Sequence, residues 1–227
     1  MKFRLLKRKY NLKSEIKNIK SAIRPYKDVL IFMVTLLVTN YFWKFTVTGD
    51  ESGGQFTWFG LDITAPFVFM AEHISKVVYH MVALLRDTVH LNNYTNIRYD
   101  SGYGVSIVWG CTALKQSFIW LCLMLTVAPA VSNQQSAISN QQSAIINHKL
   151  QIRSLWLRKL WFIPLGWLCC YGFNIFRIFV IALLMEHHPA WFGMLHTGFK
   201  YLFYAMLFGL WVWFVEKIRP SAQTSND

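Results

Sequence analysis

Residues 105–131 read VSIVWGCTALKQSFIWLCLMLTVAPAV, and this run of 27 residues contains one charged side chain, Lys115. An apolar run longer than about 18 residues is typical of a transmembrane helix. The stretch also contains Cys111, a side chain that can act as a nucleophile. It therefore predicts a membrane-spanning segment that carries chemistry.

The composition of the whole chain agrees with a membrane protein. Of its 227 residues, 54% are hydrophobic and 15% are charged, whereas soluble domains average about 25% charged residues. These values exclude an ordinary soluble globule and a disordered chain. Its four cysteines are too few and too unfavourably spaced for a disulfide scaffold or a zinc site.

Further apolar segments extend the pattern on both sides. The segments expected to cross the membrane are residues 29–48, 105–131, 160–185 and 197–215. Residues 65–85 are ambiguous, because polar side chains gather on one helical face and apolar ones on the other. The polar face holds Glu72, His73, Lys76 and His80, and the apolar face holds Phe67, Met70, Ile74, Val77, Val78, Met81 and Leu84. This split favours an amphipathic helix in the membrane interface over a fifth span.

The charge distribution predicts an orientation. The chain has a formal net charge of +12, and residues 1–28 hold ten basic and two acidic side chains. This arm is expected to lie against anionic lipid in the cytoplasm, and a nucleic-acid-binding arm is a weaker alternative. Residues 49–104 hold more acidic than basic side chains, which suits the outside, whereas residues 132–159 hold four basic and no acidic ones.

The expected fold is an all-α polytopic membrane protein with about four transmembrane helices, or five if 65–85 spans. The amphipathic helix and short extended segments would lie on the outer face. The expected regions are a basic arm (1–28), a first span (29–48), an extracytoplasmic segment (49–104), a membrane core (105–215) and a cytoplasmic tail (216–227). Within the core, 132–159 is expected to be a cytoplasmic linker, where SNQQSAI occurs twice in tandem.

Three reactive side chains are expected at one depth near the outer face. Cys111 would lie six residues into its helix, about 9 Å along the axis, and Arg177 about 26 Å into a helix that runs outward. His196 directly precedes the last span. A charged side chain inside an apolar span is costly and therefore marks a candidate functional site.

Neighbouring side chains strengthen this prediction. Lys115 is four residues from Cys111, and on one helical face it would favour the thiolate. Asn174 and Arg177 are three residues apart and share a face. Alternatives remain open: a cysteine can simply pack, an arginine can snorkel, and His187 or His188 could replace His196.

The three elements together resemble exosortases and archaeosortases. The segment VSIVWGCTALKQSFIWLCLML resembles their nucleophile region, FNIFRIFVIALL resembles their Asn-x-x-Arg signature, and LHTGFKYLFYAMLFGLWVW is similar to their final histidine and span. The resemblance covers about residues 96–215, in the same order as in the family. Ala113 departs from it, because the family usually has glycine there.

The resemblance implies a membrane-embedded cysteine protease-transpeptidase of the cytoplasmic membrane. Cys111 would be the nucleophile, Arg177 would orient it or stabilise the oxyanion, and His196 would act as acid and base. Lys115, Gln116 and Asn174 would support them. The implied partners are exported proteins ending in a short motif, a transmembrane helix and a basic tail, with a lipid, a glycan or water as acceptor. The resemblance implies neither a metal nor an organic cofactor.

Two other functions remain compatible with the sequence. A thiol–quinone oxidoreductase in a four-helix bundle would need a second exposed cysteine beside Cys111. A non-enzymatic scaffold or assembly factor of the cell envelope would tolerate replacement of Cys111, Arg177 and His196, and would fit if Ala113 marks a degenerate site.

Overall fold

The computed structural model describes residues 26–49, 54–128 and 141–218, and this part of the chain is mostly helical. Its longer helices are α2 (Lys27–Thr46), α3 (Thr64–Ala83), α4 (Leu114–Thr126), α5 (Gln141–Met185) and α6 (Phe192–Trp213). The predicted basic arm lies outside the described residues except for its last three. The predicted tail lies outside them after Ile218.

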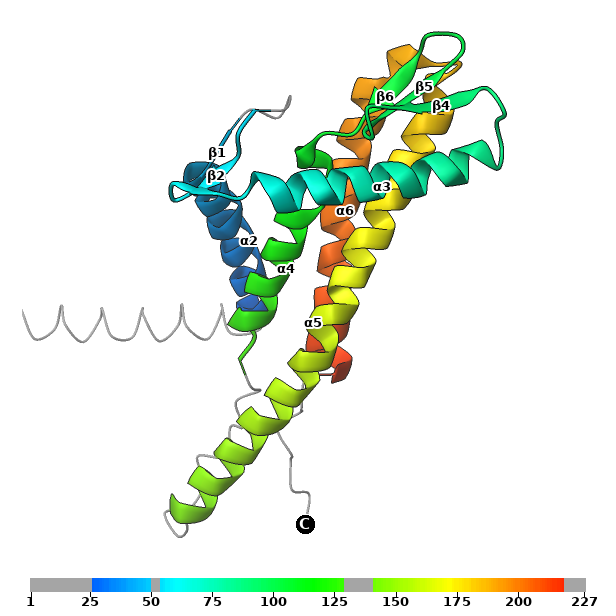
Figure 1. Cartoon of the computed structure of the whole chain (residues 1–227). Helices are drawn as coiled ribbons and strands as arrows, with labels where there is room; N and C mark the ends of the chain where they lie inside the picture. The colour runs from blue at the N-terminus through cyan, green and yellow to red at the C-terminus, as the bar shows by residue number, and fades with distance from the viewer. Residues whose placement is uncertain (1–25, 50–53, 129–140, 219–227) are drawn as a thin grey trace, which may run out of the picture.

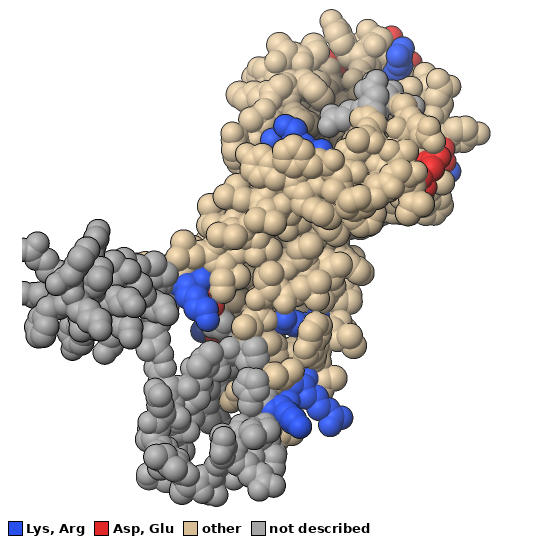
Figure 2. Space-filling model, turned by 90° about the vertical axis from the view of Figure 1, so that its left-hand side faces the viewer, with Lys and Arg blue, Asp and Glu red and all other residues tan. Residues whose placement is uncertain are grey.

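Three stretches are long and apolar enough to cross a membrane: Lys27–Thr46, Lys149–Met185 and Pro189–Ile218. They contain the predicted spans 160–185 and 197–215 and nearly all of 29–48. The described face shown in Figure 2 is mostly uncharged. The described part of the chain is therefore compatible with a helical membrane protein.

The span predicted over 105–131 is wrong as a continuous helix. Its α-helical part, α4, has 13 residues and is about 20 Å long, whereas the hydrocarbon core is about 30 Å thick. Strand β6 (Gly104–Ser106) and a 3-10 turn (Trp109–Cys111) precede the helix, and Val127 after it is extended. Pro129 follows closely, and a proline disfavours helical backbone in the residue before it.

Helix α5 supplies hydrogen bonds to both ends of this short helix. At one end, Asn174 Nδ2 donates to the carbonyl oxygen of Cys111 at 2.5 Å. At the other end, Lys159 Nζ donates to the carbonyl oxygen of Val127 at 2.7 Å. These donors are fifteen positions apart, or about 22 Å along α5, which matches the length of α4 with its flanking turns. The two helices lie side by side in Figure 1.

Two tryptophans join the same helices between these ends. Trp167 Nε1 donates to the carbonyl oxygen of Ser117 at 3.1 Å, and Trp120 Nε1 donates to that of Ile163 at 3.3 Å. In these four hydrogen bonds the residue number on α5 decreases as the residue number of the partner on or beside α4 increases. The two helices are therefore antiparallel. Gly166 allows the close approach, because a Cβ atom at this position would overlap the Trp120 ring.

The predicted linker 132–159 is helical over its second part. Helix α5 begins at Gln141 and is 45 residues long, so the second SNQQSAI copy continues into a helix. The first copy lies outside the described residues. The residues after position 140 favour a helix by their intrinsic propensities, among them Gln, Ala, Ile, Lys and Leu. The sequence repeat and its polar composition did not predict this helix.

The amphipathic helix predicted over 65–85 is confirmed as a helix over Thr64–Ala83. It lies across the direction of α5 and α6 (Figure 1), an orientation that suits an interfacial helix. Ile74 and Val78 are fully buried, and His73, on the exposed side, pairs with the Tyr171 hydroxyl at 2.7 Å. The prediction for Leu84 is wrong: the helix ends before it, and its side chain is exposed.

Short strands account for the extended segments that were predicted. One antiparallel sheet contains β1 (Val47–Thr48), β2 (Thr57–Trp58) and β3 (Leu61–Asp62), and the other contains β4 (Val89–Asn92), β5 (Asn96–Tyr99) and β6. The Tyr99 hydroxyl donates to the carbonyl oxygen of Ala182 at 2.9 Å, which fixes the second sheet on α5. Burial raises the pKa of Tyr99, and the Glu186 carboxylate adds to the effect.

The close packing of α4 on α5 gives a first prediction. Gly166→Ala should lower the free energy of unfolding by about 1–3 kcal/mol or more, because the added methyl group overlaps the buried Trp120 ring. Gly172→Ala is the matched control on the same helix, since no atom beyond the neighbouring backbone of α5 lies within 4 Å of the place that its added methyl group would take. Denaturation of the purified protein in detergent measures both. Equal stability of the two variants would contradict the packing.

Candidate functional site

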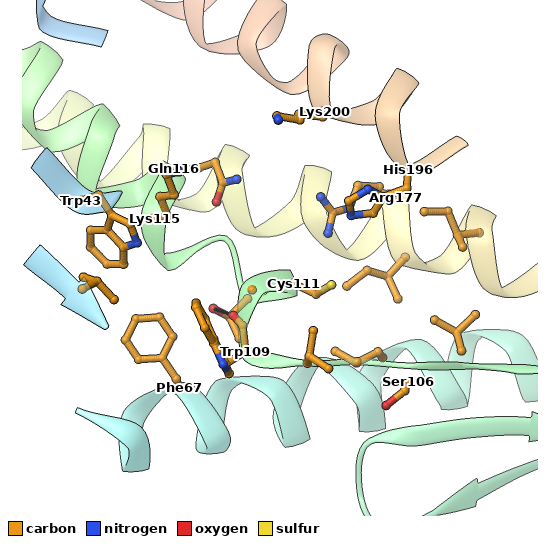
Figure 3. Close-up of a pocket in the computed structure, with 18 of the residues that line it drawn as sticks. Trp43, Phe67, Ser106, Trp109, Cys111, Lys115, Gln116, Arg177, His196 and Lys200 are labelled. Atoms are coloured by element: carbon orange, nitrogen blue, oxygen red, sulfur yellow. Dashed lines mark hydrogen bonds between the residues drawn. The ribbon is translucent and has the colours of Figure 1, made fainter. Parts of the chain in front are cut away.

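One pocket brings together the three predicted catalytic side chains. Its volume is about 560 Å³, and Cys111, Arg177 and His196 all line it (Figure 3). Two of the predicted supporting residues, Lys115 and Gln116, line it as well. The third, Asn174, is not a lining residue, but its side chain donates to the Cys111 carbonyl oxygen. Three separate segments of the chain, around Cys111, Arg177 and His196, thus meet at one site.

Cys111 ends the 3-10 turn that connects β6 to α4. Its own N–H donates to the carbonyl oxygen of Val108 at 2.8 Å, and the Thr112 hydroxyl donates to that of Trp109 at 2.7 Å. The prediction that Cys111 lies inside a helix is therefore wrong, as is its shared helical face with Lys115. The pocket nevertheless receives both side chains, because the turn redirects the chain between them.

Ala113 completes this turn in a left-handed conformation. Its φ is 60° and its ψ is 8°, and it directly precedes the first residue of α4. An L-residue other than glycine adopts this region at a cost of about 1–2 kcal/mol. This position is where the resembled family usually has glycine. This chain forms the turn with alanine and bears the conformational strain of its positive φ.

Arg177 and Asn174 share a face of α5, as predicted. Arg177 is 6% exposed and Asn174 is 1% exposed, which is unusual for such polar groups in an apolar helix. The Arg177 guanidinium lies within electrostatic range of the Cys111 thiol. Its buried Nε has no hydrogen-bond partner among the described residues, and a buried donor without a partner is costly.

His196 lies inside α6 and not in a loop before the last span. The helix begins at Phe192, so His196 lies about one turn from its start, where its ring stacks on Phe192 with centroids 5.8 Å apart. In Figure 3, His196 and Arg177 lie side by side, and the Cys111 sulfur points toward them. Three chemically different groups therefore face one space: a thiol, a guanidinium and an imidazole.

The two alternative histidines lie elsewhere. His187 pairs with Glu186 at 3.5 Å, and the His188 ring stacks on Trp191 with centroids 4.5 Å apart. Neither is among the residues that line the pocket. Of the three histidines considered for this role, the structure therefore favours His196.

The other cysteines are not at this site. Cys122, Cys169 and Cys170 carry free thiols, and none of them lines the pocket. Within the described residues no group of three or more His, Cys, Asp or Glu side chains is arranged to hold a metal ion. Among the described residues that line the pocket, Cys111 is therefore the single thiol, and Arg177 and His196 lie beside it.

Sequence reasoning missed two basic residues of the pocket. Lys44, near the end of α2, and Lys200, on α6, were counted only as parts of predicted spans; both line the pocket. A signal for Lys200 was present, because His196, Lys200 and Tyr204 recur every four residues on one helical face. The contribution of α2 had no such signal, because it depends on tertiary packing.

The strain at Ala113 gives a second prediction. Ala113→Gly should raise the free energy of unfolding by roughly 0.5–1 kcal/mol, because glycine adopts positive φ without a steric penalty. Ala71→Gly is the control, since Ala71 lies within helix α3 and glycine there should destabilise the protein by about 1 kcal/mol. Thermal denaturation measures the change in stability of both variants. Destabilisation by Ala113→Gly would contradict the turn geometry.

Comparisons of the chain with protein families, with curated proteins and with solved structures found no match. The chemistry of this site is therefore inferred from its residues, its geometry and the sequence resemblance.

Proposed function

We propose that this chain is a membrane-embedded cysteine peptidase-transpeptidase of the exosortase type. One observation carries the proposal: Cys111, Arg177 and His196, which are distant in sequence, line one pocket. The buried Asn174 side chain fixes the turn that holds the nucleophile. Such a thiol, an oxyanion-stabilising cation and an acid–base group are the parts that acyl transfer needs.

The proposed reaction has two halves. In the first, the Cys111 thiolate attacks a scissile peptide carbonyl, and Arg177 donates hydrogen bonds to the oxyanion. His196 gives a proton to the leaving amine, which departs and leaves a thioester. In the second, water or an acceptor attacks the thioester, and His196 takes its proton. The thiolate is then restored.

The proposed substrates are exported proteins with a short motif, a transmembrane helix and a basic tail at the carboxyl end. The pocket lies near the ends of three long apolar helices, which suits a substrate that crosses the same membrane. The charge distribution favours the cytoplasmic membrane, with about four spans and the pocket on the outer side. The short helix α4 would count as the fourth span only together with its flanking segments.

The two other functions have less support. A thiol–quinone oxidoreductase needs a second thiol beside the first, and among the described pocket residues Cys111 is the single cysteine. A buried arginine is energetically costly in an apolar helix, and a scaffold does not need one beside a thiol. Replacement of the three catalytic residues distinguishes these functions from the proposed one.

A third prediction concerns the nucleophile. Cys111→Ala should abolish removal of carboxy-terminal segments from exported membrane proteins, because no thioester can form. Cys122→Ala is the matched control, since Cys122 lies on α4 and outside the pocket. Mass spectrometry of membrane proteins from cells with each variant measures processing. Equal processing with Cys111→Ala and with the unmodified chain would refute the proposal.

A fourth prediction concerns the guanidinium. Arg177→Lys should lower the processing rate by about 100-fold or more, because an ammonium group does not replace the planar, bidentate donor. Arg153→Lys, an exposed position on the same helix, should leave the rate unchanged. Pulse–chase labelling of a processed protein gives both rates. A fully active Arg177→Lys variant would rule out this role.

A further inference from the structure

The pocket has more positive charge than acyl transfer requires. Lys44 on α2, Lys115 on α4, Arg177 on α5 and Lys200 on α6 line it, and no acidic side chain is among its described lining residues. Lys44 and Lys200 have no acidic partner within 4 Å in the described part of the chain. Basic side chains appear within a hollow near the upper end of the molecule (Figure 2). Like charges that converge on one space favour an anionic ligand.

The depth of the pocket narrows the choice of anion. Lys44 lies within one turn of the end of α2, and His196 lies about one turn from the start of α6. Helix α2 has 20 residues and spans about 30 Å, the thickness of the hydrocarbon core. The pocket therefore lies where a span meets the headgroup region, and lipid phosphate is the abundant anion at this depth.

The remaining lining suits the same environment. Trp43, Trp109 and Tyr204 line the pocket, and tryptophan and tyrosine are typical of the boundary between hydrocarbon and headgroups. The buried Arg177 Nε has no partner within the described residues, and guanidinium groups bind phosphate oxygens well. A volume of about 560 Å³ falls in the usual range of small-molecule pockets, about 300–1,000 Å³.

We propose that the pocket binds the phosphate group of an anionic phospholipid headgroup, which Lys44 contacts from α2 and Lys200 from α6. This inference depends on the charge and position of the pocket and goes beyond the proposed peptidase chemistry. It implies that a membrane lipid occupies space next to Cys111 and shields the thiol. Binding can therefore be measured without knowledge of any peptide substrate.

The test measures how fast neutral N-ethylmaleimide alkylates Cys111 in the full chain, purified in a neutral detergent. Mass spectrometry of the Cys111 peptide gives the rate. Dihexanoyl phosphatidylglycerol should slow alkylation in a saturable manner and at lower concentration than dihexanoyl phosphatidylcholine, because it has a net negative charge. Inorganic phosphate at equal concentration should protect much less, because it has no glycerol or acyl portion.

Two lysine variants and a control assign the effect to the pocket. Lys44→Gln and Lys200→Gln should each raise the half-protecting concentration of phosphatidylglycerol about fivefold, as expected for one basic residue near a headgroup. Lys76→Gln, an exposed position on α3 outside the pocket, should change nothing. Thermal denaturation confirms that each variant is folded.

Three outcomes would overturn the proposal. Absence of protection by phosphatidylglycerol would mean that the basic side chains of the pocket do not bind a lipid phosphate. Equal protection in the lysine variants would assign the effect to the acyl chains. Equal protection by inorganic phosphate would make the ligand free phosphate and not a lipid. None of these outcomes depends on peptidase activity, so a failure here is distinguishable from a failure of the proposed function.

Discussion

Hydrogen bonding of backbone groups inside an apolar environment is the constraint on which the site depends. A helix as short as α4 ends before it has crossed a hydrocarbon core, and each unsatisfied backbone group there costs several kcal/mol. Helix α5 satisfies carbonyl groups at both ends through Asn174 and Lys159. The two tryptophan bonds between them keep the helices in one register.

The same bonds position the chemistry. Because Asn174 holds the carbonyl of Cys111 while Arg177 lies one turn further along the same helix, the thiol and the guanidinium are fixed to one rigid element. The 3-10 turn and the left-handed Ala113 leave Cys111 outside regular helix, so that its thiol reaches the pocket and is not buried between helices. A side chain held in this way suits a reaction that requires precise approach to a carbonyl.

Hydropathy and charge predicted the long helices and the amphipathic α3, because these properties are summed over many residues. The shared face of Asn174 and Arg177 also followed from helical spacing. The short length of α4 could not be predicted in this way. The extended and turn segments beside it are as apolar as a transmembrane helix, so hydropathy does not distinguish them from the helix itself. Cys111 and His196 line one pocket although both were assigned the wrong local structure. Lys44 was missed because only tertiary packing brings α2 to the pocket.

The central claim is that Cys111 forms a covalent acyl intermediate in this pocket. The most direct measurement is intact-protein mass spectrometry of the chain purified from its native membrane, before and after hydroxylamine, which cleaves thioesters. The chain is quenched in acid before purification, because acid protonates His196 and removes the base that the second half of the reaction needs. We predict a mass increase on Cys111 that hydroxylamine removes. Absence of this adduct in the acid-quenched chain, from cells that process the substrate, would contradict the claim.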